Sequence, residues 1–344
     1  MKAIVLQGDK TAKYVTDRSE PRSRPDYVKV NVKAVALNPT DWKHREYDGL
    51  NHPGLLSGCD FAGVAAEDTD SSARKQFKKG DRVCGFAHGG NELEKEDGAF
   101  AETIVARAGG QMHIPDNWSF EEAAGMGVAT ITVGQGMYQQ MKLNWPNDPI
   151  KEPEWILIYG GSSAMGSVGI EFAKLSGYKV VTVCSPRNFD MVKSYGADEA
   201  FDYNDPASVE KIKDVTGGGV RLVWDAIALE TTSDFCEKVM VKGAHYGHIL
   251  MGKPKRDDVK VTSNLGYTAA GEEVKKIFGN FSKEDAEKDY DWIIKWVKVV
   301  EPLLAQGKIK PHPVKAGKGL EGVIGGMDDM RDEKISGQKL VFTL

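Results

Sequence analysis

Short apolar runs fill the first third of the chain and are separated by Gly, Pro and Asp. They lie at residues 2–6, 27–37, 61–67, 81–86 and 99–106. Short strands at even spacing are typical of a small barrel or sandwich. We therefore expect a β-rich domain at the start of the chain.

The pattern changes near residue 117. Residues 118–141 have helical spacing, with Ser119 as the N-cap and Glu122 three residues later, which is a capping box. From Trp155 onward, strand and helix patterns alternate, which predicts a parallel sheet covered on both faces. Strands are expected at 155–160, 178–184, 199–203, 221–227, 244–250 and 259–265.

The last part of the chain predicts one long helix and one strand. Apolar residues form a single helical stripe at Trp292, Ile293, Trp296, Val297, Val300, Leu303 and Leu304. Residues 336–344 have a strand pattern, and we expect this strand to return to the first domain.

A glycine turn, YGGSSAMG, joins the strand at 155–160 to a helix expected over Ala164–Leu175. Gly161 and Gly166 hold the first and last positions of the dinucleotide-binding fingerprint, where they permit a tight turn and close helix packing. Ser163 replaces the middle glycine; it is small enough for a phosphate to approach, and its hydroxyl can add a hydrogen bond. A pyrophosphate would lie at the positive end of this helix.

The second strand of this βαβ unit ends at Cys184 and continues as SPRN, with no acid. Enzymes that use NADH keep an acid here for the ribose hydroxyls, and that acid repels a 2′-phosphate. Neutral donors and cations that suit a phosphate occur instead: Ser185, Arg187, Asn188, Lys193 and Tyr203. They predict an NADPH site, with a polar surface turn as the alternative.

Composition excludes several classes of protein. The 344 residues carry a net charge of −5, with no dense basic stretch, so we expect no nucleic-acid binding. No apolar run is long enough to span a membrane, and the N-terminus shows no signal-peptide pattern. Four scattered cysteines encode neither a disulfide scaffold nor a structural zinc lobe, which favours a cytoplasmic protein. Residues 68–80 and 88–98 are expected to be solvated loops, and the second is also a candidate lid.

Several motifs in this order resemble the medium-chain dehydrogenase/reductase superfamily: GDRVCGF, GAFAE, IPDNWSFEEAA, ILIYGGSSAMG and SGQKLVF. Within it, LNPTDWK, SGCDFAGV and TVCSPRNFD resemble the fungal trans-acting enoyl reductases, which serve polyketide synthases. Quinone oxidoreductases are the next most similar group. The resemblance implies an α/β protein with a Rossmann doubly wound parallel sheet and a GroES-like β-barrel domain. The expected bounds are 1–124, completed by 308–344, for the barrel and 125–307 for the Rossmann domain.

The zinc ligands of alcohol dehydrogenases have no counterpart in this sequence. Asn38 stands where the first cysteine would fall, and Gly58-Cys59-Asp60 stands where Gly-His-Glu would fall. Zinc needs three good nitrogen or sulfur ligands. We therefore expect no metal. His245 and His248 flank a predicted core strand and are interpreted as structural.

Without zinc, the natural reaction is hydride addition from NADPH to an activated C=C bond, with donors meeting the charge that develops on the carbonyl oxygen. Lys43 and Thr132 are the candidate catalytic residues. Lys43 matches a lysine that the trans-acting enoyl reductases place over the nicotinamide; Thr132 matches a substrate-facing threonine that starts a helix. A solvated lysine and a core threonine are the alternatives, and Tyr47 is a weaker acid candidate.

The predicted function is NADPH-dependent reduction of activated C=C bonds in a small-molecule or carrier-bound unsaturated acyl substrate, with a polyketide synthase as a candidate partner. The alternatives are a quinone or enone oxidoreductase, a carbonyl reductase and an NADPH-binding structural protein. A monomer and a homodimer are both open. The expected cofactor contacts are Thr40, Asp41, Lys43, Gly161, Ser162, Ser163, Ala164, Met165, Gly166, Ser185, Arg187, Asn188, Lys193, Tyr203, Leu250 and Lys339.

Overall fold

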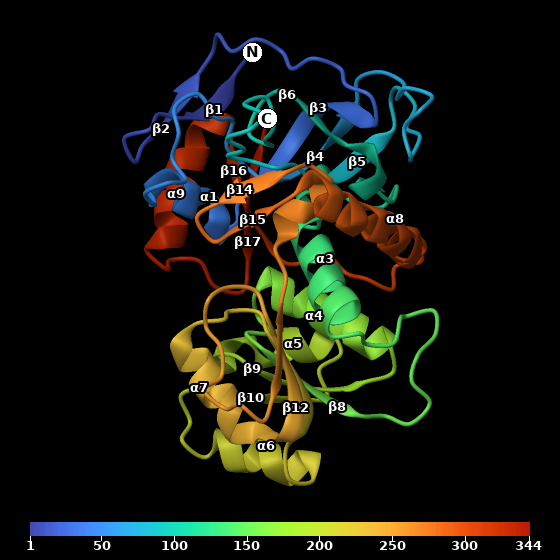
Figure 1. Ribbon diagram of the computed structural model, residues 1–344, viewed down its shortest axis with the longest axis vertical. Helices are drawn as coiled ribbons and strands as arrows, with labels where there is room; N and C mark the ends of the chain where they lie inside the picture. Colours follow the sequence, from blue (N-terminus) through green and yellow to red (C-terminus); the bar gives the residue numbers. More distant parts are fainter. The chain divides into compact units, whose positions relative to one another are not determined.

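The computed structural model describes residues 1–344 and contains two compact units. The first consists of Met1–Ile131 and Gly266–Leu344, and the second of Thr132–Leu265. The first unit thus also contains residues 125–131 and 266–307, which were expected in the Rossmann domain. The domain bounds expected from the resemblance remain a prediction. Figure 1 labels the elements of both units.

The second unit is built on six parallel strands in the order β10-β9-β8-β11-β12-β13. Numbered along this unit, the order is 3-2-1-4-5-6, which is that of a doubly wound dinucleotide-binding sheet. The strands are β8 (Trp155–Tyr159), β9 (Lys179–Val183), β10 (Glu199–Phe201), β11 (Val220–Asp225), β12 (Met240–His248) and β13 (Lys260–Ser263). The predicted Rossmann sheet is confirmed.

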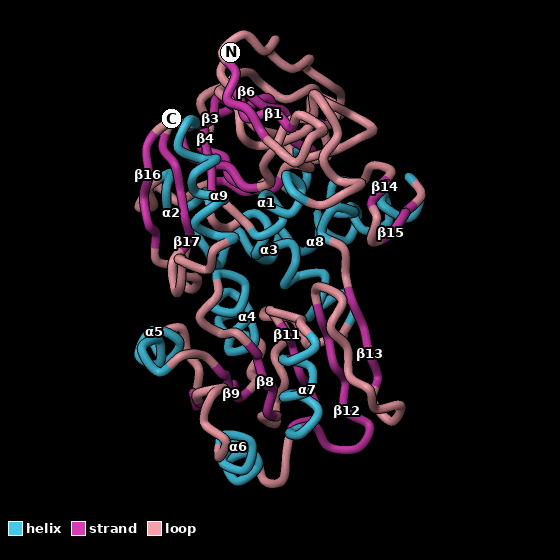
Figure 2. The backbone as a smooth tube through the Cα atoms, turned by 90° about the vertical axis from the view of Figure 1, so that its left-hand side faces the viewer, coloured by secondary structure: helices cyan, strands magenta, loops and turns pink.

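Helices flank this sheet, as Figure 2 shows. They are α4 (Ala164–Leu175), α5 (Phe189–Ser194), α6 (Ser208–Thr216) and α7 (Glu230–Val239), and α4 has the bounds expected from the sequence. Because the sheet is covered, the side chains of Leu157, Val181 and Val223 are fully buried. A doubly covered parallel strand needs such a nearly continuous apolar run.

The first unit contains a larger, mainly antiparallel sheet in the order β16-β17-β3-β4-β5-β7, with β6 paired to β3. The terminal strand β17 pairs with β3 at Phe342 and Val35, which confirms that the end of the chain returns to the first domain. The strands are β3 (Tyr27–Ala36), β4 (Asp60–Ala65), β5 (Arg82–Phe86), β6 (Thr103–Arg107), β7 (Met112–His113), β16 (Val314–Lys318) and β17 (Lys339–Thr343); β1 (Ala3–Leu6) pairs with β2 (Ala12–Val15).

The predicted long helix at 118–141 is three pieces: α2 (Phe120–Ala124), α3 (Gly127–Val133) and the π-helix η2 (Gly134–Gln140). The capping box of Ser119 and Glu122 is confirmed at the start of α2. α2 ends at Gly125, and Gly127 lies so close to the carbonyl of Gly85 that a Cβ there would collide with it. The helix is therefore interrupted after α2, and α3 begins as a separate helix at this close contact.

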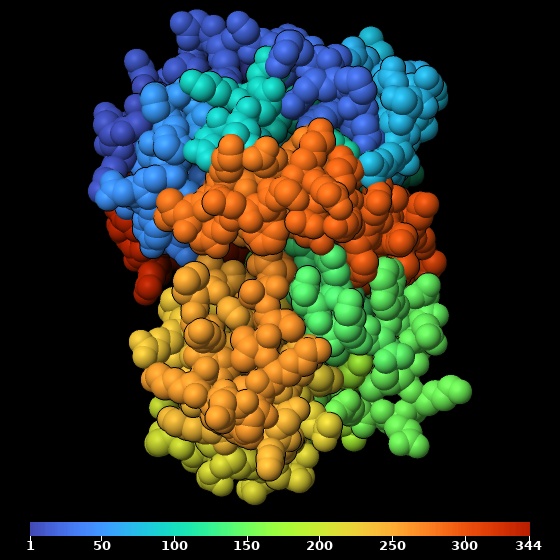
Figure 3. Space-filling model, in the orientation of Figure 1, coloured from blue at the N-terminus to red at the C-terminus, as the bar shows by residue number.

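The remaining elements of the first unit include a segment that starts with the 3₁₀ turn η4 (Gly266–Ala270) and a hairpin of β14 (Val274–Lys276) and β15 (Gly279–Phe281), which the sequence patterns did not predict. The segment continues into α8 (Lys283–Ala305), which contains the predicted apolar stripe and confirms the expected long helix. In Figure 3 this orange segment forms a continuous band over one face of the unit. The others are α1 (Pro39–Glu46), η1 (Ala108–Gly110), η5 (Leu320–Gly322) and α9 (Val323–Arg331); η3 (Pro186–Asn188) belongs to the second unit.

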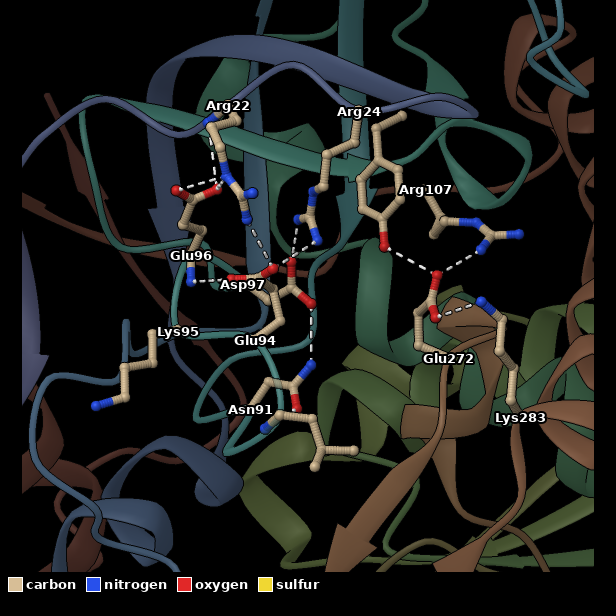
Figure 4. Close-up of polar contacts among 12 residues, drawn as sticks. Arg22, Arg24, Asn91, Glu94, Lys95, Glu96, Asp97, Arg107, Glu272 and Lys283 are labelled. Carbon is tan, nitrogen blue, oxygen red and sulfur yellow. Dashed lines mark hydrogen bonds and ion pairs between the residues drawn. The ribbon is translucent and has the colours of Figure 1, made fainter.

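The loop at 88–98 differs from its prediction as a solvated loop. Asn91 and Asp97 are buried, and Asp97 accepts hydrogen bonds from Arg24 and from the Asn91 amide (Figure 4). Its charge-rich sequence gave no sign that one of its acids, Asp97, is buried and paired with Arg24, whereas Glu92 is exposed as expected. No helix has both the length and the apolar character needed to cross a bilayer.

Candidate cofactor and substrate site

The glycine turn in the second unit is closely packed. A Cβ on Gly161 would collide with the Thr182 side chain, and one on Gly166 would collide with the carbonyl of Gly160. Gly160 has a φ of +76°, in the left-handed region. These constraints explain why glycine stands at both fingerprint positions: β8, the turn and α4 approach one another too closely for side chains.

Ser163 is the N-cap of α4. Its hydroxyl accepts a hydrogen bond from the Gly166 N–H (3.0 Å) and donates one to the Gly160 carbonyl (2.8 Å). The expected bond from this hydroxyl to a phosphate would require it to leave Gly160. The first-turn N–H groups of Ala164 and Met165 have no intrahelical acceptor, because helix geometry provides none there. They and the helix dipole can hold an anion.

Predicted residues for the 2′-phosphate gather where β9 and β10 end. The hydroxyls of Ser185 and Tyr203 are 3.2 Å apart. Arg187 and Lys193 are exposed and form no ion pair. Asn188 is buried, and its side-chain N–H group lacks a partner. These groups offer two free cations and several neutral donors.

One acid near this place was missed in the sequence. Asp202 follows β10, and its carboxylate accepts a hydrogen bond from the Asn204 N–H (2.9 Å). Burial, with the Asp202 charge as a second cause, raises the pKa of the Cys184 thiol to about 11. The acid lies on the neighbouring strand, not on the end of β9, so the NADH-type position remains without one.

A buried ion cluster occupies the first unit where zinc enzymes keep ligands. Lys339 donates to Asn38 Oδ1 and lies 3.0 Å from Asp60 Oδ2, and the Asn38 amide donates to the same Asp60 oxygen (2.8 Å). The other Asp60 oxygen accepts from the Val128 N–H (2.6 Å). Asn38, Asp60 and Lys339 thus each have a polar partner within the unit.

Asp41 lies beside this cluster. Its Oδ2 accepts from the Asn38 N–H (2.6 Å), and its buried Oδ1 has no partner. Burial is the main reason why the pKa of Asp41 is raised to about 7; the Asn38 hydrogen bond lowers it and the Asp60 charge raises it further. Asp41 and Lys339, both expected cofactor contacts, are therefore almost fully enclosed within this unit.

The short helix α1 presents the other predicted residues. Asn38 precedes it and Pro39 opens it, a favourable start because proline needs no N–H partner there. Lys43 is half-buried on α1, 5.8 Å from the Trp42 ring centre, and forms no ion pair. Burial lowers the pKa of Lys43. Its ammonium is therefore available for a ligand.

Three further predicted positions differ in exposure, and one of them differs from expectation. Thr132 lies near the end of α3, and only 6% of the residue is exposed. The expectation that it begins a helix is wrong, because α3 begins at Gly127. Tyr47 is exposed and packs edge-on against Trp42. Leu250 is also exposed, and its carbonyl accepts from His248 Nδ1 (2.8 Å).

A second buried polar group was missed in the sequence. It contains His44, His88, Tyr267 and Lys276, which come from four different segments of the first unit. Cys59 lies 3.9 Å from the Tyr267 hydroxyl. The one available signal was the pair Lys275-Lys276 in the hairpin sequence VKKIFG, which does not show that the second lysine is buried. No three His, Cys, Asp or Glu side chains are arranged to hold a metal ion.

The two units define the class of protein. Residues 24–116 match the alcohol dehydrogenase GroES-like domain, and residues 164–294 match the zinc-binding dehydrogenase domain. The chain is thus a medium-chain dehydrogenase/reductase, and the expected α/β fold with a GroES-like domain is confirmed. The "zinc-binding" description belongs to the domain family and assigns no ligand to this chain.

Curated relatives narrow the class. The chain is 43% identical over 364 aligned residues to the trans-enoyl reductase resD of Aspergillus sclerotiorum, with 99% of each chain covered. It is 47% identical to the trans-enoyl reductase TOXD of Cochliobolus carbonum, over 79% of this chain and 91% of that one. The CurK enoyl reductase shares the fold, with a TM-score of 0.75, 18% identity and coverage of 99% and 98%. The chain belongs to the trans-enoyl reductases, as the resemblance predicted, and is an oxidoreductase.

Proposed function

We propose that this protein is an NADPH-dependent enoyl reductase that acts in trans on an α,β-unsaturated acyl thioester carried by a polyketide synthase. The observation that carries the reaction class is the likeness to trans-enoyl reductases along the full chain. The second unit supports the cofactor, since a dinucleotide-type turn precedes a strand end that offers cations and no acid.

The residues present fit NADPH. Gly166 lets α4 pack directly on the backbone of Gly160 and Gly161, and the open amides of Ala164 and Met165 at the start of this helix suit a pyrophosphate. The buried Asn188 amide lacks a partner, which a ribose or phosphate oxygen would supply. Arg187 and Lys193 would hold the 2′-phosphate, with Ser185 and Tyr203 as donors. When bound, the nicotinamide supplies the hydride for the β-carbon of the substrate.

Lys43 is proposed to hold and orient the bound groups. Its ammonium is half-buried without an anionic partner, so an oxygen of the substrate or cofactor would relieve its desolvation. A positive donor near the acyl oxygen stabilises the charge that develops there. Thr132 remains a proposed substrate contact, and Asp41, Lys339 and Leu250 remain proposed cofactor contacts.

A substrate panel tests the proposal. The purified protein is given NADPH with a crotonyl thioester, a carrier-bound enoyl chain, a quinone, an enone and a ketone. NADPH consumption and the product mass are followed, and a gain of two hydrogens on the thioester is the expected result. Reduction of the quinone or ketone alone would reassign the protein to the corresponding alternative. NADPH binding without turnover of any substrate would indicate a non-catalytic role.

A further inference from the structure

Lys276 is a buried lysine at the end of β14. Only 8% of the residue is exposed, whereas Ile277 and Phe278 at the tip of the same hairpin are 59% and 42% exposed. Its ammonium donates to His44 Nε2 (3.0 Å) and to the carbonyl of Gly90. No carboxylate lies within ion-pair distance of this ammonium. The tip of the hairpin is therefore apolar and exposed, whereas the Lys276 ammonium points into the unit.

Stability alone does not explain this arrangement. A buried ammonium without an acid costs free energy, and an apolar side chain of similar length would avoid that cost. The chain that enters the hairpin has a separate anchor: Glu272, two residues before β14, accepts a hydrogen bond from Arg107 (2.7 Å; Figure 4) and one from Tyr27 (3.3 Å). Lys276 is therefore not the only polar contact that ties this segment to the unit.

The contacts of His44 determine its tautomer. Nδ1 lies 2.8 Å from the carbonyl of Thr40, which can only accept, so Nδ1 carries the proton. Nε2 is then the acceptor that the Lys276 ammonium requires. Burial, helped by the Lys276 charge, lowers the pKa of His44 to about 3, so the ring is neutral. Two neighbours thus fix both nitrogens of this ring.

His44 leads to the Thr40 hydroxyl. His44 Nδ1 is 3.2 Å from Thr40 Oγ1, and that hydroxyl is 2.6 Å from the hydroxyl of Tyr267. The Tyr267 ring also lies 5.1 Å from the Lys276 ammonium. His44, Tyr267 and Lys276 are buried, whereas Thr40 is partly exposed. Thr40 is therefore the member of this chain of hydrogen bonds that a ligand can reach.

We propose that Lys276 is a positioning residue of the reductase: by holding the His44 ring, it fixes the direction of the Thr40 hydroxyl toward bound cofactor or substrate. This inference rests on the proposed function for its effect on rate, since Thr40 is an expected cofactor contact. The orientation of His44 itself does not depend on that function.

The titratable side chains that face the Lys276 ammonium belong to the several elements packed against it. Burial lowers its pKa to about 8, while Cys59 and Glu92 act in the opposite direction. The pKa values of the nearby His44 and His88 lie far below this range, and those of Cys59 and Tyr267 are raised well above their usual values. None of these two histidines, the thiol and the phenol titrates near pH 8. Asp41, which acts on Cys59 and Tyr267, has a pKa raised to about 7, so its ionisation is expected before that of Lys276 and loss of the Lys276 proton is the change expected above pH 8.

The test compares Lys276→Met and Lys276→Arg with a matched control, Lys275→Met. Lys275 is the preceding residue, half-exposed and paired with Glu273 at 3.3 Å. The first measurement is ¹⁵N-histidine NMR of the ligand-free protein, with His44 assigned by His44→Gln. We expect a protonated Nδ1 with slow proton exchange in the wild type and in the control. In Lys276→Met, we expect at least tenfold faster exchange and a shifted Nε2 resonance.

The second measurement is the pH profile of enoyl-thioester reduction. We expect kcat of the wild type to fall above about pH 8, and Lys276→Met to lose at least tenfold in kcat at pH 7, with little change in KM and no high-pH decline. The arginine variant should restore part of the rate. The melting temperature of the ligand-free methionine variant should change little, because the variant removes a buried charge but leaves His44 Nε2 and the Gly90 carbonyl without their donor.

Clear results would overturn the inference. An Nε2–H tautomer of His44 in the wild type would do so, as would a methionine variant with unchanged exchange and unchanged kcat. Should the methionine variant not fold, the arginine variant and the wild-type spectrum still decide the tautomer. A wild-type protein that reduces no enoyl thioester would refute the proposed function, while the histidine spectrum would still test the role of Lys276.

Discussion

Replacement of Arg187 by alanine should weaken NADPH binding far more than NADH binding. Arg187 lies in η3, directly after β9, and its guanidinium is exposed without an ion pair. The two cofactors differ only in the 2′-phosphate, so a side chain that binds this group changes one affinity and leaves the other. The ratio of the two dissociation constants therefore isolates the contact.

The expected magnitude follows from the setting of Arg187. A hydrogen bond to a charged group contributes about 1.5–3 kcal/mol, which corresponds to roughly ten- to a hundredfold in Kd. Solvent exposure places this arginine toward the lower part of that range. Asp202, which directly follows β10, would repel a phosphate bound at the proposed site, so Asp202→Asn should shift the ratio the other way.

Isothermal titration of the purified protein with each cofactor measures both constants. Arg221→Ala is the matched control, because Arg221 is also exposed but lies at the start of β11, paired with Glu154 at 3.5 Å. Raising the salt from 0.15 M to 1 M should shrink the wild-type preference, since the Debye length falls from about 8 Å to about 3 Å. Equal binding of NADPH and NADH by the wild type, or an equal loss of both in Arg187→Ala, would refute the assignment.

Four further predictions concern the first unit and the metal. Lys43→Ala should lower the NADPH-dependent rate of enoyl reduction at least tenfold and Lys43→Arg should restore part of it; an unchanged rate would remove Lys43 from the site. Elemental analysis should find no stoichiometric zinc and chelators should leave activity intact, whereas activity lost to a chelator and regained with zinc would contradict this. Lys339→Met should lower the free energy of unfolding by about 3–5 kcal/mol because Asp60 loses its partner, and urea titration should show partial recovery with Asp60→Asn added; no loss would mean that the pair is not buried. Since the pKa of Asp41 is raised to about 7, its stabilising contribution is present below about pH 4 and is lost as the pH rises to 7; the stability of Asp41→Asn relative to the wild type should therefore rise over that window, and a constant difference would contradict the shift.

The sequence predicted the second unit well because its signals are local. The strand at Trp155, the turn and the helix Ala164–Leu175 lie within one stretch of chain, and each has its own periodicity or glycine pattern. The terminal strand was also predicted. The helix at 118–141 was predicted as one element because its break depends on the approach of Gly127 to Gly85, which no local pattern reveals.

The buried polar groups of the first unit could not be predicted, because their partners are far apart in the chain. Lys276 and His44 are separated by 232 residues, and Lys339 and Asn38 by 301. Lysines and acids usually remain at the surface, so sequence reasoning assigned Asp41 and Lys339 to a ligand. The contacts within the unit show that Lys339 has partners before any cofactor arrives.

The ion cluster explains in physical terms what stands at the positions of the zinc ligands. The sequence alone showed only that those ligands are missing. Where Asn38 and Asp60 replace zinc-ligand positions, the Lys339 ammonium provides the positive charge that a buried carboxylate requires, and the Asn38 amide completes its hydrogen bonds. The cluster thus binds its own charges within the unit, and each of its three side chains has a partner in it. The part of α1 that remains available carries Thr40, partly exposed and held by His44 and Tyr267, and Lys43, half-buried and unpaired. We therefore expect the donors that stabilise a developing oxyanion to lie on this exposed side of α1.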